Sequence, residues 1–366
     1  MPTPAHGGAG RVGWCSAGPS LLAGRWAGWC SAGSWWCGWA GGWWSAHRRL
    51  PGPGGVVLGH DGAVTRAREA VAAVLVAAVA TGTWVVVSSW PGLRPAGCLR
   101  GCATGERSPG PMRVVGLNVL HDFPRFAQLD GRIGLVAEEI RRLDADVVLL
   151  EEVPWTPETG GAAAELARRT GLNHLFLRAN GNRRAILFEE GEAILSRFPM
   201  RDPVSVRLPR GTSFFEHRIA LAATVDTPWG PVGAVVTHLS GGSASASAAQ
   251  VAALRRFVGD PRHPVLVGGD FNATDASAPI RVLAREWTDV LASASPPDTG
   301  PTCCVQDTTA PPGTALRDRI DYLWLTGSAG RVVTARRILT EPVRVAGGWL
   351  RVSDHAGLFA TVDLSQ

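Results

Sequence analysis

The sequence from Met112 onward predicts a layered α/β fold with mixed sheets. Short apolar runs of strand length alternate with stretches in which apolar residues recur at helical spacing, as at Ile133, Val136 and Ile140. Elements that alternate in this way pack in layers around a common core. The neighbouring runs 218–226 and 232–239 are separated only by a turn that contains Pro-Trp-Gly. Such a hairpin predicts antiparallel pairs, so the sheets are expected to be mixed.

The individual elements follow from apolar patterns and their flanking residues. The expected helices lie at 133–143, 162–169 and 245–257. Gly171 is expected to end the second of these. The expected strands lie at 113–120, 146–150, 193–196, 218–226, 232–239, 265–267, 319–325 and 358–362.

Polar side chains follow most of these strands at the point where each strand ends. In the stretch 265–272, three apolar residues precede Gly268 and Gly269, and Asp270 and Asn272 then fall two positions apart. In extended chain, residues two apart point to the same side. A carboxylate and an amide placed in this way can hold a hard cation or a phosphate, although an Asx turn that closes a strand is the simpler interpretation. Polar side chains at several strand ends along one edge can meet in one cleft.

Six short motifs at strand ends and loops together point to a family. They are Leu117-Asn118-Val119, Leu150-Glu151-Glu152-Val153, Thr237-His238-Leu239, Gly269-Asp270-Phe271-Asn272, Arg319-Ile320-Asp321-Tyr322 and Ser353-Asp354-His355. In this order they resemble the endonuclease/exonuclease/phosphatase superfamily, which includes DNase I-like nucleases, inositol phosphatases and neutral sphingomyelinases. The resemblance covers about residues 113–363. It implies a four-layered α/β sandwich, with two mixed β-sheets packed face to face and helices outside.

The resemblance implies a metal site for Mg²⁺, with Mn²⁺ as the second choice. Glu152 would be the principal ligand, with Asn118 beside it and Asp354 nearby. Oxygen ligands of this kind suit Mg²⁺, which keeps several waters and needs only one or two carboxylates. Glu151 departs from the family, which usually has Gln there, and this leaves open which of the two glutamates binds the metal.

The resemblance also implies a role for each remaining polar residue. His355 would be the base or electrostatic partner, with its tautomer fixed by Asp321. Asp270 would orient the attacking water, and Asn272 would hold the phosphate. His238 would donate to the phosphate or the leaving group as charge develops.

Several other residues are less clearly placed. Arg218 is expected to face the phosphate together with Asn272 and His238. Taken singly, Asn118 and Asp321 could instead cap strands or turns. Glu151 and Glu152 could be a solvated strand end, and His238 could be a packed histidine. No role is expected for His121, His174, His217 and His263. The adjacent Cys303 and Cys304 are too close for an ordinary mutual disulfide, so we expect loop structure or one cysteine bonded elsewhere.

The basic charge of the chain is confined to its N-terminal part. The net charge is +5 from 36 basic and 31 acidic residues. Nine Arg and three acidic residues precede Met112, whereas 27 Arg and 28 acidic residues follow from that position. The C-terminal part therefore lacks the overall positive field of most nucleic-acid-binding domains. A nucleic acid remains a possible partner but is not favoured.

The N-terminal third has no pattern of a packed domain. Residues 1–69 are rich in Trp and Gly, with eight of the fifteen Trp in the first 44 residues. This segment is expected to be translated from upstream of the true start, or else to be a disordered or membrane-interface tail. Residues 70–89 are uncharged and long enough for a signal or transmembrane segment, and a buried helix of a soluble core is the alternative. Residues 90–111 are expected to be a linker and residues 112–366 the catalytic domain.

Export beside a membrane shapes the predicted function. The expected protein is exported, either extracellular or membrane-anchored with its catalytic domain outside. The expected activity is hydrolysis of an extracellular or membrane phosphodiester, such as a phospholipid or a sphingomyelin-like lipid, by metal-assisted in-line attack of water. A secreted or membrane-tethered DNase I-like endonuclease is the first alternative. A phosphomonoesterase or a non-catalytic membrane-associated module is the second.

Overall fold

The computed structural model describes residues 60–92, 94–104, 110–211, 213, 216–327 and 330–364. The chain divides into two compact units, Met1–Ala77 and Ala78–Gln366. Most of the segment 1–69, with its predicted tail, lies outside the described residues. The second unit contains both large sheets and all of the predicted site residues.

The first sheet is mixed and has β3 near its centre. Its strand order is β1-β5-β6-β3-β2-β16-β13, and a short β4 pairs with β3. Strands β2 and β3 are parallel, and the other pairs are antiparallel. The strands are β1 (Ala96–Cys98), β2 (Met112–Asn118), β3 (Val147–Thr156), β4 (Gly160–Gly161), β5 (Asn173–Asn182), β6 (Phe188–Ser196), β13 (Arg331–Ile338) and β16 (Gly357–Asp363).

The second sheet is also mixed. Its strand order is β11-β12-β10-β9-β8-β7, with β9 and β10 parallel and the other pairs antiparallel. The strands are β7 (Met200–Arg207), β8 (Ile219–Thr227), β9 (Gly230–His238), β10 (Val265–Asp270), β11 (Thr288–Asp289) and β12 (Asp321–Thr326). A separate hairpin joins β14 (Val343–Val345) to β15 (Gly348–Leu350).

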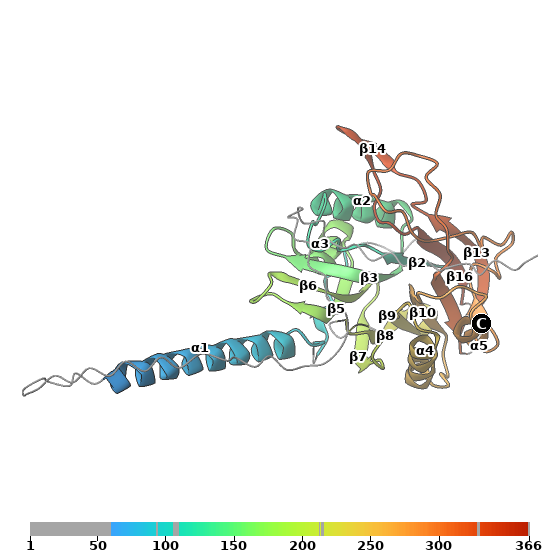
Figure 1. Cartoon of the computed structure of the whole chain (residues 1–366). Coiled ribbons are helices and arrows are strands. Elements are labelled where there is room, and N and C mark those ends of the chain that lie inside the picture. Colours follow the sequence, from blue (N-terminus) through green and yellow to red (C-terminus); the bar gives the residue numbers. More distant parts are fainter. Residues whose placement is uncertain are drawn as a thin grey trace, which may run out of the picture. The chain divides into compact units, whose positions relative to one another are not determined.

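The two sheets pack face to face, and helices cover their outer faces (Figure 1). The central core joins residues of both sheets, such as Leu149 and Leu323, with no exposed surface. Helices α2 (Leu129–Arg142) and α3 (Ala162–Thr170) accompany the first sheet, while α4 (Ala244–Val258) and α5 (Ala278–Leu283) accompany the second. Helix, sheet, sheet and helix are the four predicted layers, so the predicted fold class is confirmed.

Part of the expected linker belongs to the folded domain. Residues 96–98 form β1, which pairs with β5 in antiparallel register. Asn173 fixes the chain that follows, because its Oδ1 accepts hydrogen bonds of 3.1 Å from the backbone of Cys102 and Ala103. A disulfide joins Cys98 to Cys102. These residues fall within the segment 90–111 that was expected to be a linker, and a strand as short as β1 carries no periodicity that could reveal it.

The adjacent cysteines lie in a loop outside the named strands, as one of the two expectations had it. The structure pairs Cys303 with Cys304, and a cis peptide bond joins the two residues.

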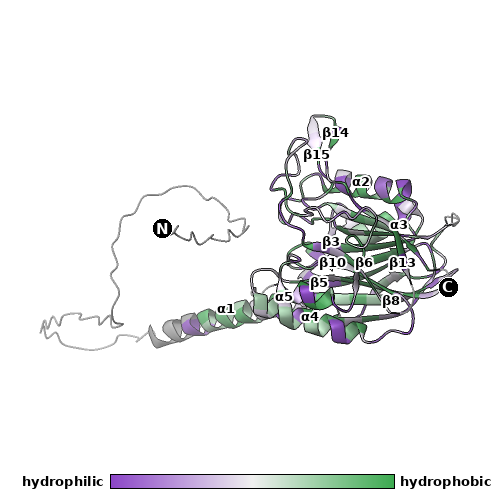
Figure 2. Cartoon of the chain, turned by 90° about the vertical axis from the view of Figure 1, so that its right-hand side faces the viewer, coloured by the Kyte–Doolittle hydropathy of each residue, from purple (hydrophilic) through white to green (hydrophobic). Residues whose placement is uncertain are grey.

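The apolar segment expected at 70–89 lies within helix α1 (His60–Ser88). Residues Arg68–Ser88 are long and apolar enough to cross a membrane, and this window has no part buried inside the protein. Figure 2 shows the apolar colouring along this helix. A signal sequence meets the same length and composition criteria, so the helix is compatible with either a signal or an anchor.

Candidate active site

The site forms where polar residues follow the inner strands of both sheets. Asp270 at the end of β10 is directly opposite His238 of β9 and Asp321 of β12. Asn118 at the end of β2 is paired with Glu151 of β3. Parallel strands place their carboxyl ends at one edge, and the antiparallel β12 begins at that same edge. The predicted residues are therefore gathered by strand register.

The glycines before Asp270 are required by close packing of the backbone. A Cβ atom on Gly269 would lie 1.9 Å from the carbonyl oxygen of Thr237, and one on Gly268 would lie 2.7 Å from Cδ1 of Leu149. Only glycine permits β10 to approach the adjacent strand and the facing sheet in this way. The Gly-Gly pair is thus a packing requirement that positions Asp270.

His355 is held by Asp321 in a buried ion pair. Its Nδ1 lies 2.9 Å from Oδ2 and 3.0 Å from Oδ1 of Asp321. Thr302 supports the pair, since its hydroxyl donates to Asp321 Oδ2 at 2.5 Å. Burial lowers the pKa of His355, but the charges of Asp321 and Asp354 outweigh this and raise it well above the usual value. His355 is therefore favoured as an imidazolium, with Nε2 directed toward Asp270 at 3.8 Å.

Asp270 has the properties of a proton acceptor near neutral pH. Burial and the charge of Asp321 raise its pKa to about 7, and His355 opposes the rise. The backbone N–H of Asn272 donates to its Oδ1 at 2.7 Å, which fixes the direction of the carboxylate. A base with a pKa close to the working pH is suited to general acid–base catalysis.

Asn272 and His238 form a second polar group beside Asp270. The Nδ2 amide of Asn272 donates to the carbonyl of Leu239 at 2.9 Å and lies 3.0 Å from Nε2 of His238. Burial, together with the charge of Arg218, lowers the pKa of His238 well below its usual value, so this ring is neutral. Nε2 also lies 3.3 Å from Oδ2 of Asp270, and Nδ1 lies 3.9 Å from Oε1 of Glu152.

The two adjacent glutamates have different environments. Glu152 faces the site, where its Oε1 accepts from Asn118 Nδ2 at 3.1 Å and its Oε2 lies 3.4 Å from His121 Nε2. Burial raises the pKa of Glu152, but the charge of His121 and the hydrogen bond from Asn118 are among the influences that lower it to about 2. A positive φ of 53° at Glu152, with a register shift between Leu150 and Val153, turns β3 at this point.

Glu151 lies away from these groups. Its side chain is buried, and its Oε1 has no hydrogen-bond partner among the described residues. Burial and the charge of Glu192 raise its pKa well above the usual value, which favours the neutral acid. An ionised metal ligand is therefore expected at Glu152.

The donor set fits a hard divalent cation. Glu152, Asp270 and Asp321 are all largely buried, and Asp354 is close by, 4.0 Å from His355 Nε2. The buried Arg132 does not pair with them, because its Nη1 donates to backbone carbonyls of residues 119, 120 and 352. Buried carboxylates in excess of nearby cations are costly unless a cation joins them. Oxygen-rich groups of this kind suit Mg²⁺ or Mn²⁺.

Arg218 precedes β8 and is 9% exposed. Its guanidinium pairs with Glu216 through Nη2, while its Nε has no partner among the described residues. Its charge lowers the pKa values of His238 and Asp270, so it contributes positive potential to the site. It also lines a cavity of about 170 Å³ with Trp90 and Arg207.

Sequence reasoning missed three contributors to this site. His121 was assigned no role, although its Nε2 contacts Glu152 and its Nδ1 accepts from the backbone of Phe123 at 2.9 Å. Thr302, which precedes Asp321 by 19 residues in the sequence, donates a hydrogen bond to its carboxylate. Cys304 Sγ lies 3.8 Å from His355 Nε2. The only available signal was the position of His121 three residues after Asn118, just beyond a strand end.

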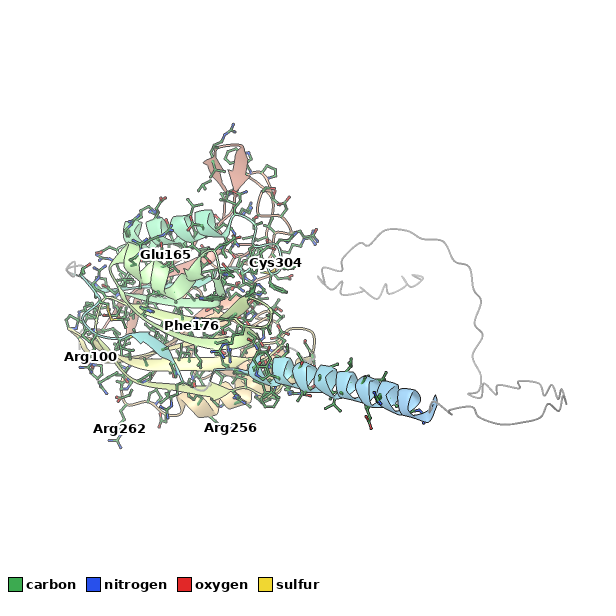
Figure 3. The ribbon with its side chains drawn as sticks, turned by 90° about the vertical axis from the view of Figure 1, so that its left-hand side faces the viewer. Arg100, Glu165, Phe176, Arg256, Arg262 and Cys304 are labelled. Atoms are coloured by element: carbon green, nitrogen blue, oxygen red, sulfur yellow. A yellow bond between two sulfur atoms is a disulfide. The ribbon has the colours of Figure 1, made fainter. Side chains whose placement is uncertain are left out.

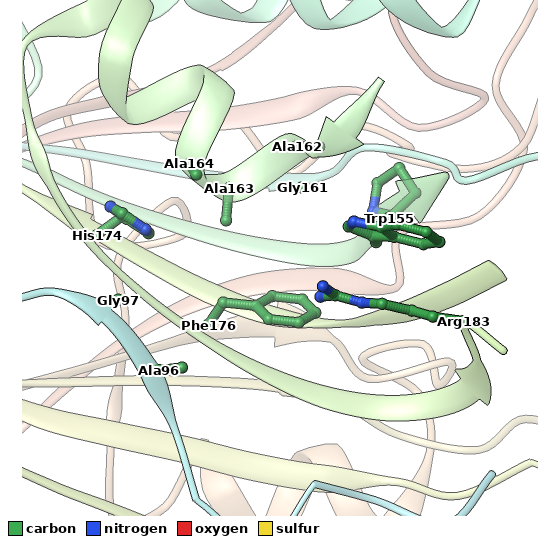
Figure 4. Close-up of a pocket in the computed structure, with 11 residues that line it drawn as sticks. Ala96, Gly97, Trp155, Gly161, Ala162, Ala163, Ala164, His174, Phe176 and Arg183 are labelled. Carbon is green, nitrogen blue, oxygen red and sulfur yellow. The ribbon is translucent and has the colours of Figure 1, made fainter. Parts of the chain in front are cut away.

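Another cavity, of about 270 Å³, contains none of these residues (Figure 4). It is lined mainly by apolar side chains and by Trp155, Phe176 and His174. Arg183 also lines this cavity, with its guanidinium carbon 4.6 Å from the Trp155 ring centroid.

The acidic site predicts a pH dependence of stability for the metal-free protein. Between pH 3.8 and about 7, folded Asp270 retains a proton that it loses in the unfolded chain. The free energy of unfolding should therefore fall as pH rises through this window, by at most about 4 kcal/mol from Asp270. Urea unfolding in EDTA across the window measures the fall, and Asp270→Asn should reduce it. A slope unchanged in this variant would contradict the assignment.

The fold and the site together define a metal-dependent phosphoesterase-like protein built on two packed mixed sheets. The model of the endonuclease/exonuclease/phosphatase family matches residues 115–355, so the chain belongs to that family. Members of this family are hydrolases that act on phosphoesters, including nucleases and phosphatases, and they typically use divalent metals. No curated protein matches the chain by sequence.

Solved structures share the fold. An endonuclease/exonuclease/phosphatase from Beutenbergia cavernae is 26% identical with a TM-score of 0.54, over 69% of this chain and 72% of that one. Danio rerio TDP2, complexed with a single-strand DNA product, is 17% identical with a TM-score of 0.55, over 70% and 100%. A mannosyl-6-phosphatase from Bacteroides thetaiotaomicron is 13% identical with a TM-score of 0.54, over 69% and 99%.

Proposed function

We propose that the protein is a phosphodiesterase that hydrolyses a membrane or extracellular phosphodiester, such as a phospholipid or a sphingomyelin-like lipid. The observation that carries the hydrolytic activity is the buried group of Asp270, Asp321 and His355, in which Nε2 of an imidazolium faces a carboxyl of raised pKa. Such a pair can accept a proton from water while stabilising negative charge on a phosphate.

Each site residue then has a defined role. Asp270 accepts the proton of the attacking water, and Asp321 holds His355 so that Nε2 faces the phosphate. Asn272 and Arg218 bind the phosphate oxygens. His238 donates to the phosphate or the leaving group as charge develops. Mg²⁺ or Mn²⁺, held by Asn118, Glu152 and Asp354, supplies positive charge to the phosphate oxygens when bound.

The preference for a membrane substrate rests on an apolar rim beside the site. The rim consists of Phe123, Ile186 and Leu187, whose side chains are 44%, 43% and 56% exposed. Phe123 stacks on Phe188 with ring centroids 4.6 Å apart. The Phe188 ring centroid is in turn 5.0 Å from that of His121, whose Nε2 contacts Glu152. Exposed apolar side chains so close to a polar site favour contact with a lipid surface.

The end of the apolar helix and the chain that follows it are bonded to β5, the strand that leads into the turn with Ile186 and Leu187. Asn182 at the end of β5 donates to the hydroxyl of Ser88. Arg178 of β5 donates to the carbonyl of Trp90 at 3.0 Å, and Gly92 donates to the carbonyl of Arg178 at 2.7 Å. If residues 70–89 are retained as an anchor, these bonds hold the rim near the point at which the chain leaves the membrane. We therefore propose a catalytic domain outside the cytoplasm, at the membrane surface.

A secreted or tethered endonuclease is the second candidate. The exposed Phe123 could stack on a base instead of entering lipid. Against this reading, the catalytic part of the chain has 27 Arg and 28 acidic residues and hence no excess of positive charge to bind a polyanion. A phosphomonoesterase is the third candidate.

A substrate panel tests the proposal. The full-length protein should hydrolyse sphingomyelin or phosphatidylinositol in vesicles with Mg²⁺, and EDTA should abolish this activity. The double variant Phe123→Ser, Leu187→Ser should lose about tenfold or more on vesicles, because each apolar side chain contributes roughly 1.5–3 kcal/mol when buried. Its activity on a soluble aryl phosphodiester should be unchanged.

Val204→Ser is the matched control, because Val204 is 52% exposed on β7 and is not part of the rim. DNA turned over faster than every lipid would support the endonuclease instead. Absence of hydrolysis of all phosphoesters, including monoesters, would refute an enzymatic function.

A further inference from the structure

Two sulfur atoms lie on the reactive side of His355. Cys304 Sγ is 3.8 Å from His355 Nε2, and the ligand atoms of Cys303, Cys304 and His355 all lie within 4.8 Å of one another. Cys303 is 2% exposed, whereas Cys304, labelled in Figure 3, is partly open to solvent. Neither cysteine has a part in the hydrolytic mechanism proposed above.

Backbone hydrogen bonds hold this pair in place independently of the bond between its sulfurs. Cys303 donates to the carbonyl of Asp318 at 2.9 Å and accepts from the same residue at 2.8 Å. On either side of the pair, Ala356 donates to Thr302 at 2.7 Å and Val305 donates to Asp354 at 3.1 Å. The backbone around the reduced cysteines therefore has its own fixed anchors on both sides of His355.

We propose that the reduced form of the Cys303–Cys304 pair, together with His355 Nε2, is a binding site for a thiophilic divalent cation such as Zn²⁺. Two thiolates and one imidazole nitrogen are ligands that Zn²⁺ prefers and Mg²⁺ does not. The fourth position belongs to water or to the carboxylate of Asp270, whose Oδ2 is 3.8 Å from the same nitrogen. The cation occupies Nε2 and so removes His355 from phosphoester hydrolysis.

The site exists only while the sulfurs are reduced. In the disulfide, both sulfurs are bonded to each other and neither is a thiolate. A dithiol reductant transfers two electrons and two protons, the sulfur–sulfur bond breaks, two cysteine thiols form, and the reductant becomes a disulfide. Binding of Zn²⁺ then releases the two thiol protons and the Nε2 proton of His355 to water. Oxidation by a protein disulfide reverses these steps and expels the cation.

Binding of the cation by the reduced cysteines would keep the hydrolase inactive in a reducing compartment, and oxidation after export would make it active. That consequence rests on the proposed function, whereas the cation site itself does not. Disulfides persist in extracellular and periplasmic compartments and are rare in the cytosol. The oxidation state of Cys303 and Cys304 depends on the compartment, and it would thus decide whether the cation can occupy His355.

Cadmium binding tests the site without any reference to activity. Full-length protein is reduced with dithiothreitol, freed of the reductant without air, and titrated with Cd²⁺, which gives thiolate-to-metal absorption in the ultraviolet. Because the chain has seven cysteines, the informative quantity is the difference between variants. Cys303→Ser/Cys304→Ser should lose one high-affinity equivalent, whereas the matched control Cys98→Ser/Cys102→Ser should keep it. His355→Ala should weaken that equivalent by about tenfold or more.

The single variant Cys304→Ser keeps the buried Cys303 and serves if the double variant fails to fold. Hydrolysis by the reduced protein should be inhibited by Zn²⁺ in excess Mg²⁺, and hydrolysis by the oxidised protein should resist the same concentration. Equal Cd²⁺ binding by the wild type and the folded serine variants would overturn the site. Equal inhibition of both oxidation states would overturn the regulation. Loss of the Cd²⁺ equivalent in a protein that hydrolyses no phosphoester would confirm the site and refute the proposed function.

Discussion

Replacing Asp270 by Asn should lower the turnover of phosphoester hydrolysis by roughly a hundredfold to ten-thousandfold, the usual contribution of a positioned acid–base group. The amide preserves the shape of the side chain and can still accept from the backbone N–H of Asn272. It cannot take a proton from water. The substitution also removes a buried carboxyl whose pKa is raised to about 7, so the metal-free variant should be at least as stable as the parent at neutral pH.

Steady-state rates on the best substrate of the panel measure the loss, and thermal unfolding shows whether the variant is folded. Asp202→Asn is the matched control, because Asp202 is a highly exposed aspartate on β7 that pairs with Arg201. It should retain full activity. A loss smaller than about tenfold in Asp270→Asn would show that another group accepts the proton.

Replacing Glu152 by Gln should abolish metal-dependent activity, while the same change at the adjacent Glu151 should be tolerated. Glu152 is ionised and contacts Asn118 and His121, so its loss removes a carboxylate from the metal set. We expect activity to fall by at least about a hundredfold and the Mg²⁺ requirement to rise. Metal titrations followed by activity and by calorimetry separate the two effects.

Glu151→Gln is the matched control within the same strand. Glu151 is buried and its pKa is raised. In the folded protein its carboxyl therefore keeps a proton that the same carboxyl loses in the unfolded chain once the pH exceeds its ordinary pKa. Removing that ionisation should raise the free energy of unfolding relative to the parent as pH rises above about 5. Reversal of the two phenotypes, with Glu151 needed for metal and Glu152 dispensable, would contradict the assignment.

The sequence predicted the layered fold because its strands are nearly uninterrupted apolar runs. Strands buried on both faces, as in β3 and β10, leave few alternatives to a sheet that is covered by another sheet and by helices. The polar residues were predictable as a group because each follows such a run. Their individual roles came from the resemblance and stay proposals, although strand register brings Asp270 opposite both His238 and Asp321.

The features that were missed depend on contacts distant in sequence or on backbone geometry. Thr302 supports Asp321 by a side-chain hydrogen bond that no local pattern announces. His121 acquires a role only because the turn at Glu152 brings its carboxylate to the loop after β2. The pairing of Cys303 with Cys304 joins two adjacent residues of a loop, and no spacing in the sequence indicates it. The strand β1 is specified by its partner β5 more than by its own three residues.

The position of β16 has a consequence for biosynthesis. This strand lies between β13 and β2, pairing with the first long strand of the domain, and Asp354 and His355 immediately precede it. Arg132 joins the segments next to these two strands, because its Nη1 donates to the carbonyl of Val119, after β2, and to that of Val352, before β16. A ribosome must therefore translate nearly the whole domain before the proposed site can assemble. On the proposed function, nascent and prematurely terminated chains would not hydrolyse phosphoesters in the cell that makes them.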